Sequence, residues 1–93
     1  MVASFFQYGR VSIFDDKGEV KRLVERVIQE IDSEVTIDRI RKMDFSYIFI
    51  LSKKDKQIEV ELGREEIEAS QEWRKGLISE TLKEKIKNRL LEF

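Results

Sequence analysis

Residues 46–52 of the chain read SYIFILS, and this short stretch decides which fold the rest of the sequence can build. Successive side chains of a β-strand point to opposite faces of the sheet. Tyr47, Phe49 and Leu51 therefore line one face, and the two isoleucines between them line the other. Both faces are apolar, so each needs a cover, either from elsewhere in the chain or from a partner.

Two further strands are predicted beside this one. Residues 35–42 (VTIDRIRK) begin with alternating apolar positions and lose the alternation near Arg39 and Ile40, which indicates a β-bulge. Residues 56–62 (KQIEVEL) alternate regularly between apolar and acidic side chains. The connections between these strands are only a few residues long, which favours an antiparallel meander over residues 35–62.

The clearest helix signal covers residues 17–32. Apolar side chains recur there at helical spacing without a miss. Asp16 and Glu19 have the spacing of the N-cap and N3 positions of a capping box. We therefore predict an amphipathic helix whose apolar stripe covers one face of the sheet, with Ile28 and Phe49 in the core.

The two ends of the chain are less regular. Residues 5–14 (FFQYGRVSIF) predict either a hairpin that turns at Gly9 or one strand with a bulge there. The last third predicts a short helix from about Arg64 and a second helix over residues 79–91. The apolar stripe is interrupted between them, which indicates a break near residues 73–76.

Together these elements predict a single domain over residues 1–93 with the order β(β)-α-β-β-β-α. This is an α+β fold, a two-layer sandwich of helices on a small, mostly antiparallel sheet. The second sheet face has several candidate covers: the aromatic N-terminal segment, helices on opposite faces of the sheet, a second copy of the chain, or a ligand. The α-β-β-β-α order resembles that of double-stranded-RNA-binding domains, by topology alone. Those domains carry a lysine-rich start to the last helix, whereas residues 64–68 here read REEIE.

The composition argues against several classes of function. The chain has no Cys and no His, which removes thiol chemistry, the commonest general base and the commonest metal ligand. Paired carboxylates are expected by chance where 40% of residues are charged, and no glycine-rich phosphate-binding motif occurs. We expect a protein that is not an enzyme and has no cofactor and no metal. The longest apolar run, YIFIL, is far below the roughly 20 residues of a membrane span, so we expect no membrane contact and a cytoplasmic location.

Two functions remain. The first is a non-catalytic interaction module that binds a protein partner, or a second copy as a homodimer, through a sheet face or the C-terminal helix, where Trp73, Leu77 and Leu91 are predicted to share a narrow apolar edge. The alternative is single-stranded nucleic-acid binding, with Tyr47 and Phe49 stacking bases on an open sheet face rather than belonging to the core. The basic residues near that strand are Arg39, Arg41, Lys42, Lys53 and Lys54. The net charge of −1 gives no general attraction to nucleic acid, which favours the first function.

Overall fold

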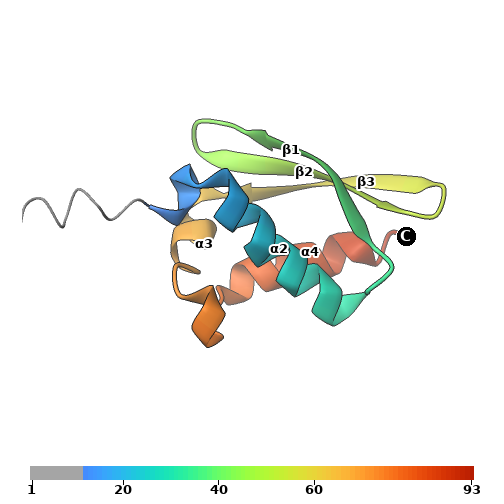
Figure 1. Cartoon of the computed structure of the whole chain (residues 1–93). Helices are drawn as coiled ribbons and strands as arrows, with labels where there is room; N and C mark the ends of the chain where they lie inside the picture. The colour runs from blue at the N-terminus through green and yellow to red at the C-terminus, as the bar shows by residue number, and fades with distance from the viewer. Residues whose placement is uncertain (1–11) are drawn as a thin grey trace, which may run out of the picture.

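A computed structural model describes residues 12–93. The elements in chain order are η1 (Ile13–Asp15), α2 (Lys17–Ile31), β1 (Thr36–Lys42), β2 (Ser46–Lys53), β3 (Lys56–Gly63), α3 (Arg64–Glu68), η2 (Trp73–Lys75) and α4 (Glu80–Leu90). The strands form one antiparallel sheet in the order β1-β2-β3, and the helices lie on one side of it (Figure 1). The predicted α+β two-layer fold is confirmed. The prediction of a hairpin or a bulged strand over residues 5–14 falls almost entirely outside the described residues.

The register of the middle strand β2 with its two neighbours determines on which face of the sheet each side chain lies. Phe49 pairs with Val60 of β3, and both side chains belong to the core. The bulge predicted in β1 is confirmed, because the register with β2 shifts between Ile37 and Arg39. Asp38 is therefore an additional residue in β1, and its neighbours on either side point to opposite faces of the sheet.

The core lies between the sheet and the helices. Its buried side chains from α2, β2 and α4 are Val20, Leu23, Val24, Val27, Ile28, Tyr47, Phe49, Leu51, Leu82, Ile86 and Leu90. The predicted burial of Ile28 and Phe49 is confirmed. The alternative with helices on opposite faces of the sheet is wrong, because α2 and α4 both cover the same face (Figure 1).

The 3-10 helix η1 covers one end of this core. Phe14 is fully buried and meets the Tyr47 ring edge to face, with 5.0 Å between the ring centroids. The Tyr47 hydroxyl donates a hydrogen bond to the Phe14 carbonyl oxygen at 2.5 Å. Burial raises the pKa of Tyr47 above its ordinary 10.0, because the charged phenolate is poorly solvated there. Within the described residues, the N-terminal part of the chain thus packs on the helix-covered face of the sheet and not on the opposite one.

The segment between α3 and α4 is attached to the first turn of α2. It turns at Gly76, whose φ of 88° lies in the left-handed region that favours glycine. Arg74 donates two hydrogen bonds to the Glu19 carboxylate, with N–O distances of 2.6 and 2.7 Å. The predicted N-cap is confirmed, because Asp16 Oδ1 accepts the Glu19 backbone N–H at 3.1 Å. The Glu19 carboxylate, predicted to complete a capping box, instead binds Arg74.

Truncation of Ile28 or Phe49 to Ala should lower the free energy of unfolding by about 2–5 kcal/mol, because each change leaves a cavity in the core. Chemical denaturation measures this loss. Ile31→Ala is the matched control, since Ile31 ends the same helix and is 42% exposed. A loss in either core variant that is no larger than the loss in the control would contradict this packing.

Glu19→Gln should lower the melting temperature at pH 7 but not in acid. The Arg74 guanidinium beside Glu19 holds the pKa of that carboxyl below its ordinary 4.5. A carboxylate with a lowered folded-state pKa stabilises the protein above its unfolded-state pKa, and this contribution is lost as the pH falls through the folded-state pKa. We expect a difference of about 1–4 °C at pH 7, because the ion pair is partly exposed. The melting temperatures of the variant and the native protein should converge at about pH 2.

The control for this measurement is Glu25→Gln, an identical change at an exposed position of the same helix. No ion pair among residues 12–93 includes Glu25. Its melting temperature should follow that of the native protein at each pH. A Glu19→Gln difference that stays constant from pH 7 to pH 2 would show that the Arg74 contact does not act through the charge of Glu19.

Candidate interaction surface

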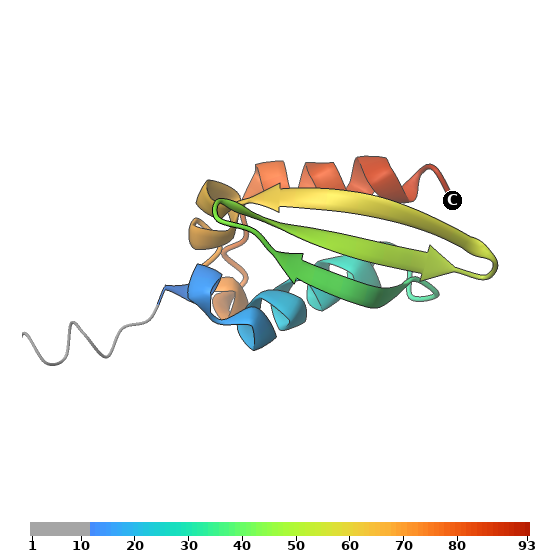
Figure 2. The same cartoon turned by 90° about the horizontal axis from the view of Figure 1, so that it is seen from above.

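One face of the sheet is turned away from the helices, and we call it the outer face. Its residues are Thr36, Arg39, Arg41, Ser46, Ile48, Ile50, Ser52, Gln57, Glu59 and Glu61, as the strand register assigns them. Figure 2 looks onto this face, with the strands in front of the helices. No helix among residues 12–93 covers it, so the open side of the sheet is a candidate binding surface.

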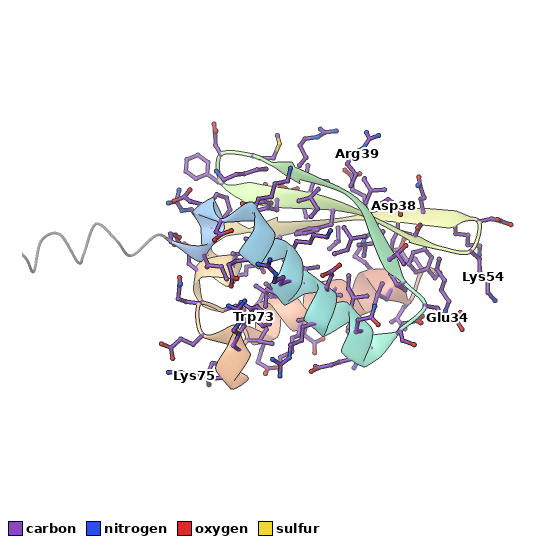
Figure 3. The ribbon with its side chains drawn as sticks, viewed as in Figure 1. Glu34, Asp38, Arg39, Lys54, Trp73 and Lys75 are labelled. Atoms are coloured by element: carbon purple, nitrogen blue, oxygen red, sulfur yellow. The ribbon has the colours of Figure 1, made fainter. Side chains whose placement is uncertain are left out.

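The centre of the outer face consists of two parallel rows of three residues. Read across β1, β2 and β3, these rows are Arg39–Ile50–Glu59 and Arg41–Ile48–Glu61. The two isoleucines are half-buried, and the charged residues on both sides of them are exposed. The side chain of Arg39 points away from the helices (Figure 3). The outer face therefore has an arginine edge on β1, an aliphatic centre on β2 and a glutamate edge on β3.

The two charged edges do not neutralise each other within one molecule. Strands lie about 4.8 Å apart, so side chains on β1 and β3 start about 10 Å from each other across β2. Among residues 12–93, no ion pair within 4.0 Å includes Arg39, Arg41, Glu59 or Glu61. Their charges remain available to a partner, and the sign changes from one edge of the face to the other.

Hydrogen bonds hold the polar side chains at one end of the outer face. Ser52 Oγ donates to Asp38 Oδ1 at 3.0 Å, and Gln57 Nε2 donates to Asp38 Oδ2 at 3.0 Å. The hydroxyl oxygens of Thr36 and Ser52 lie 3.1 Å apart. A shallow hollow of about 260 Å³ lies beside this network, with Ile50 among its lining residues. The bulge residue Asp38 thus organises one end of the face and leaves the isoleucine accessible.

The structure does not bring the predicted nucleic-acid residues together. Tyr47 and Phe49 are fully buried beneath the helices, so no base can stack on them; their interpretation as core residues is confirmed. Lys42 lies on the other side of the sheet from the outer face, with Nζ 4.8 Å from the Phe14 ring centroid. The remaining basic residues predicted from the sequence are Arg39 and Arg41 on the outer face and Lys53 and Lys54 near the β2–β3 turn. Figure 3 labels Arg39 and Lys54.

Lys53 already has a partner within the chain. Its Nζ lies 2.6 Å from Asp32 Oδ2, and this contact joins the end of β2 to the C-cap of α2. The hydrogen bond lowers the pKa of Asp32 below its ordinary 3.8 and raises the pKa of Lys53 above 10.5. Lys53 therefore contributes to the packing of α2 on the sheet, and the basic residues do not form one track for a phosphate backbone.

The predicted edge of Trp73, Leu77 and Leu91 is not continuous. Trp73 is only 6% exposed, with Arg74 4.5 Å and Arg26 5.9 Å from its ring (Figure 3). Leu77 and Leu91 are 59% and 75% exposed, but they lie at opposite ends of the 11-residue helix α4. The left-handed turn between Trp73 and Leu77 ends the helical phase, so a helical wheel drawn through it places residues on a common face that does not exist.

A hollow of about 700 Å³ lies between α3 and the start of α4. Its most buried ionisable group, Glu66, is used by the fold: Oε1 accepts the Gly63 backbone N–H at 2.6 Å and a Lys85 Nζ–H at 2.9 Å. Over residues 12–93, no three His, Cys, Asp or Glu side chains are grouped so that they could hold a metal ion. In the same range, no helix has the length and apolar character needed to cross a membrane.

Sequence reasoning predicted that a sheet face could bind a partner, but it did not identify which face is open or that arginines and glutamates border it. The alternation in β3 already placed its glutamates opposite its apolar residues. The missing information was the register, which sets the arginines and glutamates on the two sides of the isoleucines. Comparisons with models of protein families, with curated proteins and with solved structures found no match to the chain.

Proposed function

We propose that the protein is a non-catalytic interaction module that binds protein through the outer face of its sheet. One observation carries this proposal: a sheet face that no helix among residues 12–93 covers presents two half-buried isoleucines between an arginine edge and a glutamate edge. Apolar side chains at the centre with charged side chains around them are typical of a protein interface. The arginines and glutamates of this face form no ion pair among residues 12–93, so their charges can pair with those of a partner.

The same charges disfavour the nucleic-acid alternative. The outer face has two arginines and two glutamates, and the carboxylate of the bulge residue Asp38, bonded to Ser52 and Gln57 of that face, adds a third negative charge beside them. A phosphate backbone that reached Arg39 and Arg41 would lie close to these carboxylates, and binding driven by counterion release needs the opposite charge balance. The buried Tyr47 and Phe49 leave no aromatic platform there.

The chemistry of the outer face predicts modest affinity with defined orientation. Ile48 and Ile50 are already half-buried, so a partner can bury only their remaining exposed apolar area, at roughly 25 cal/mol per Å². Complementary charges contribute mainly to specificity and to the rate of association. We therefore expect the isoleucines to supply adhesion and the charged edges to determine which surface is accepted.

Site-specific photo-crosslinking tests this proposal, and a chain without Cys is well suited to it because an introduced Cys is unique. A benzophenone attached to Thr36→Cys would report on the outer face, and one attached to Glu84→Cys, on the exposed surface of α4, is the control. In an extract of the cells that make the protein, we expect protein adducts from the first position at least fivefold above the second. Adding Ile50→Lys to the first variant should remove them.

The melting temperature of each labelled variant shows whether it is folded. Equal adduct yields at the two positions, or adducts from Thr36→Cys that survive Ile50→Lys, would contradict binding through the outer face. Adducts to nucleic acid that are lost at high salt would instead support the alternative function.

A further inference from the structure

We infer that the outer face binds a second copy of the same chain, related by a two-fold axis that lies between the two sheets and runs parallel to the strands. This inference rests on the proposed function, because it names the partner of that same face. It is drawn from the charge pattern: the face carries opposite charges on its two edges and identical aliphatic residues along its centre. A surface of that kind is complementary to itself.

The two-fold rotation determines which residues of the two copies face each other. A two-fold rotation about an axis parallel to the strands preserves position along the strands and exchanges the two edges of the sheet. Strand β1 of one copy then lies over β3 of the other, and β2 lies over β2. In the first row, Arg39 faces Glu59 of the second copy, Ile50 faces Ile50, and Glu59 faces Arg39. The second row brings Arg41 and Glu61 together in the same way.

The other face-to-face symmetric arrangement fails on charge. A two-fold axis that lies between the sheets and runs across the strands places β1 over β1 and β3 over β3. The two rows are also exchanged, so Arg39 approaches Arg41 of the second copy and Glu59 approaches Glu61. Contacts of like charge then replace contacts of opposite charge. Juxtaposed like charges disfavour a wrong partner or a wrong orientation. The distribution of charge across the face therefore selects one of these two orientations.

The size of the outer face sets the strength of this contact. Three strands at a spacing of about 4.8 Å and about six residues at about 3.3 Å each give a face of roughly 14 × 20 Å. A few hundred Å² per copy is below the roughly 800 Å² per partner of a standard stable interface. The dimer is accordingly weak and depends on concentration. Salt should weaken it further, because its Arg–Glu contacts lie near solvent.

Charge reversal with rescue tests the inference on the purified 93-residue chain. The acidic variant is Arg39→Glu with Arg41→Glu, and the basic variant is Glu59→Arg with Glu61→Arg. The third variant combines all four changes and so exchanges the two edges. The control is Lys21→Glu with Lys87→Glu, at exposed positions of α2 and α4. It changes the net charge by the same amount as the acidic variant. Sedimentation equilibrium over a concentration series, at low and at high salt, measures association.

We expect the native chain and the control to self-associate alike, and the acidic and basic variants each to associate at least tenfold more weakly. An equimolar mixture of the acidic and basic variants should recover a heterodimer to within about threefold of the native affinity, because each contact then joins opposite charges again. The third variant, which combines all four changes, should recover a homodimer. The single changes Arg39→Glu and Glu59→Arg form a second pair of variants that disturbs the fold less. Neither side chain has a hydrogen-bond partner among residues 12–93 that the change would remove.

Three results would overturn the inference: a native chain that stays monomeric at millimolar concentration, a mixture no stronger than its separate components, or a control that weakens association as much as the acidic variant. The proposed function is judged separately by the crosslinking. A monomeric chain that still gives adducts to another protein from Thr36→Cys would leave the outer face as a binding site and remove the second copy as its partner.

Discussion

The fold depends on the burial of one side of strand β2. Tyr47, Phe49 and Leu51 are fully buried between the sheet and the helices, and β1, β3, α2 and α4 are arranged around that contact. A chain of 93 residues has enough helix to cover one face of a three-stranded sheet. Among residues 12–93, all the helices are used on the inner face, so none covers the outer face.

The apolar side chains of the outer face are shielded from water by a different means. Ile48 and Ile50 lie between long charged side chains, whose aliphatic stems shield apolar neighbours while their charged ends remain solvated. This shielding explains why both isoleucines are half-buried without a helix above them. It also separates the signs of charge, because the two neighbouring strands carry different residue types. The same arrangement that shields the isoleucines from water thus produces a surface with a defined electrostatic direction.

Charges elsewhere in the molecule are used in a different way. Glu19 and Arg74 join α2 to the segment before α4, and Asp32 and Lys53 join the end of α2 to β2. These pairs lie at junctions between elements and hold the helices against the inner face. The central arginines and glutamates of the outer face have no such partners among residues 12–93. We regard this contrast as the main structural reason to assign binding to the outer face rather than to the helices.

Local pattern was sufficient to predict most of the elements. The helical spacing of apolar residues and the N-cap at Asp16 predicted α2 within a residue, and the alternation of Glu59 and Glu61 predicted β3. The choice of face could not be predicted, because β2 is apolar on both sides and only contacts with distant helices decide which side is buried. The helical wheel through Gly76 failed for a local reason: the positive φ of this residue interrupts the regular helix that such a wheel assumes.

The bulge at Asp38 links the fold to the proposed binding surface. In a regular strand, Ile37, Arg39 and Arg41 would share a face, because the side-chain period is two. That face is the inner one, since Ile37 pairs with Leu51, and both arginines would then point into the core. The additional residue reverses the alternation, so Ile40 packs against the core and both arginines move to the outer face. The Asp38 carboxylate stabilises this arrangement by accepting hydrogen bonds from β2 and β3. A single inserted position therefore completes the core on one side of the sheet and creates the arginine edge on the other.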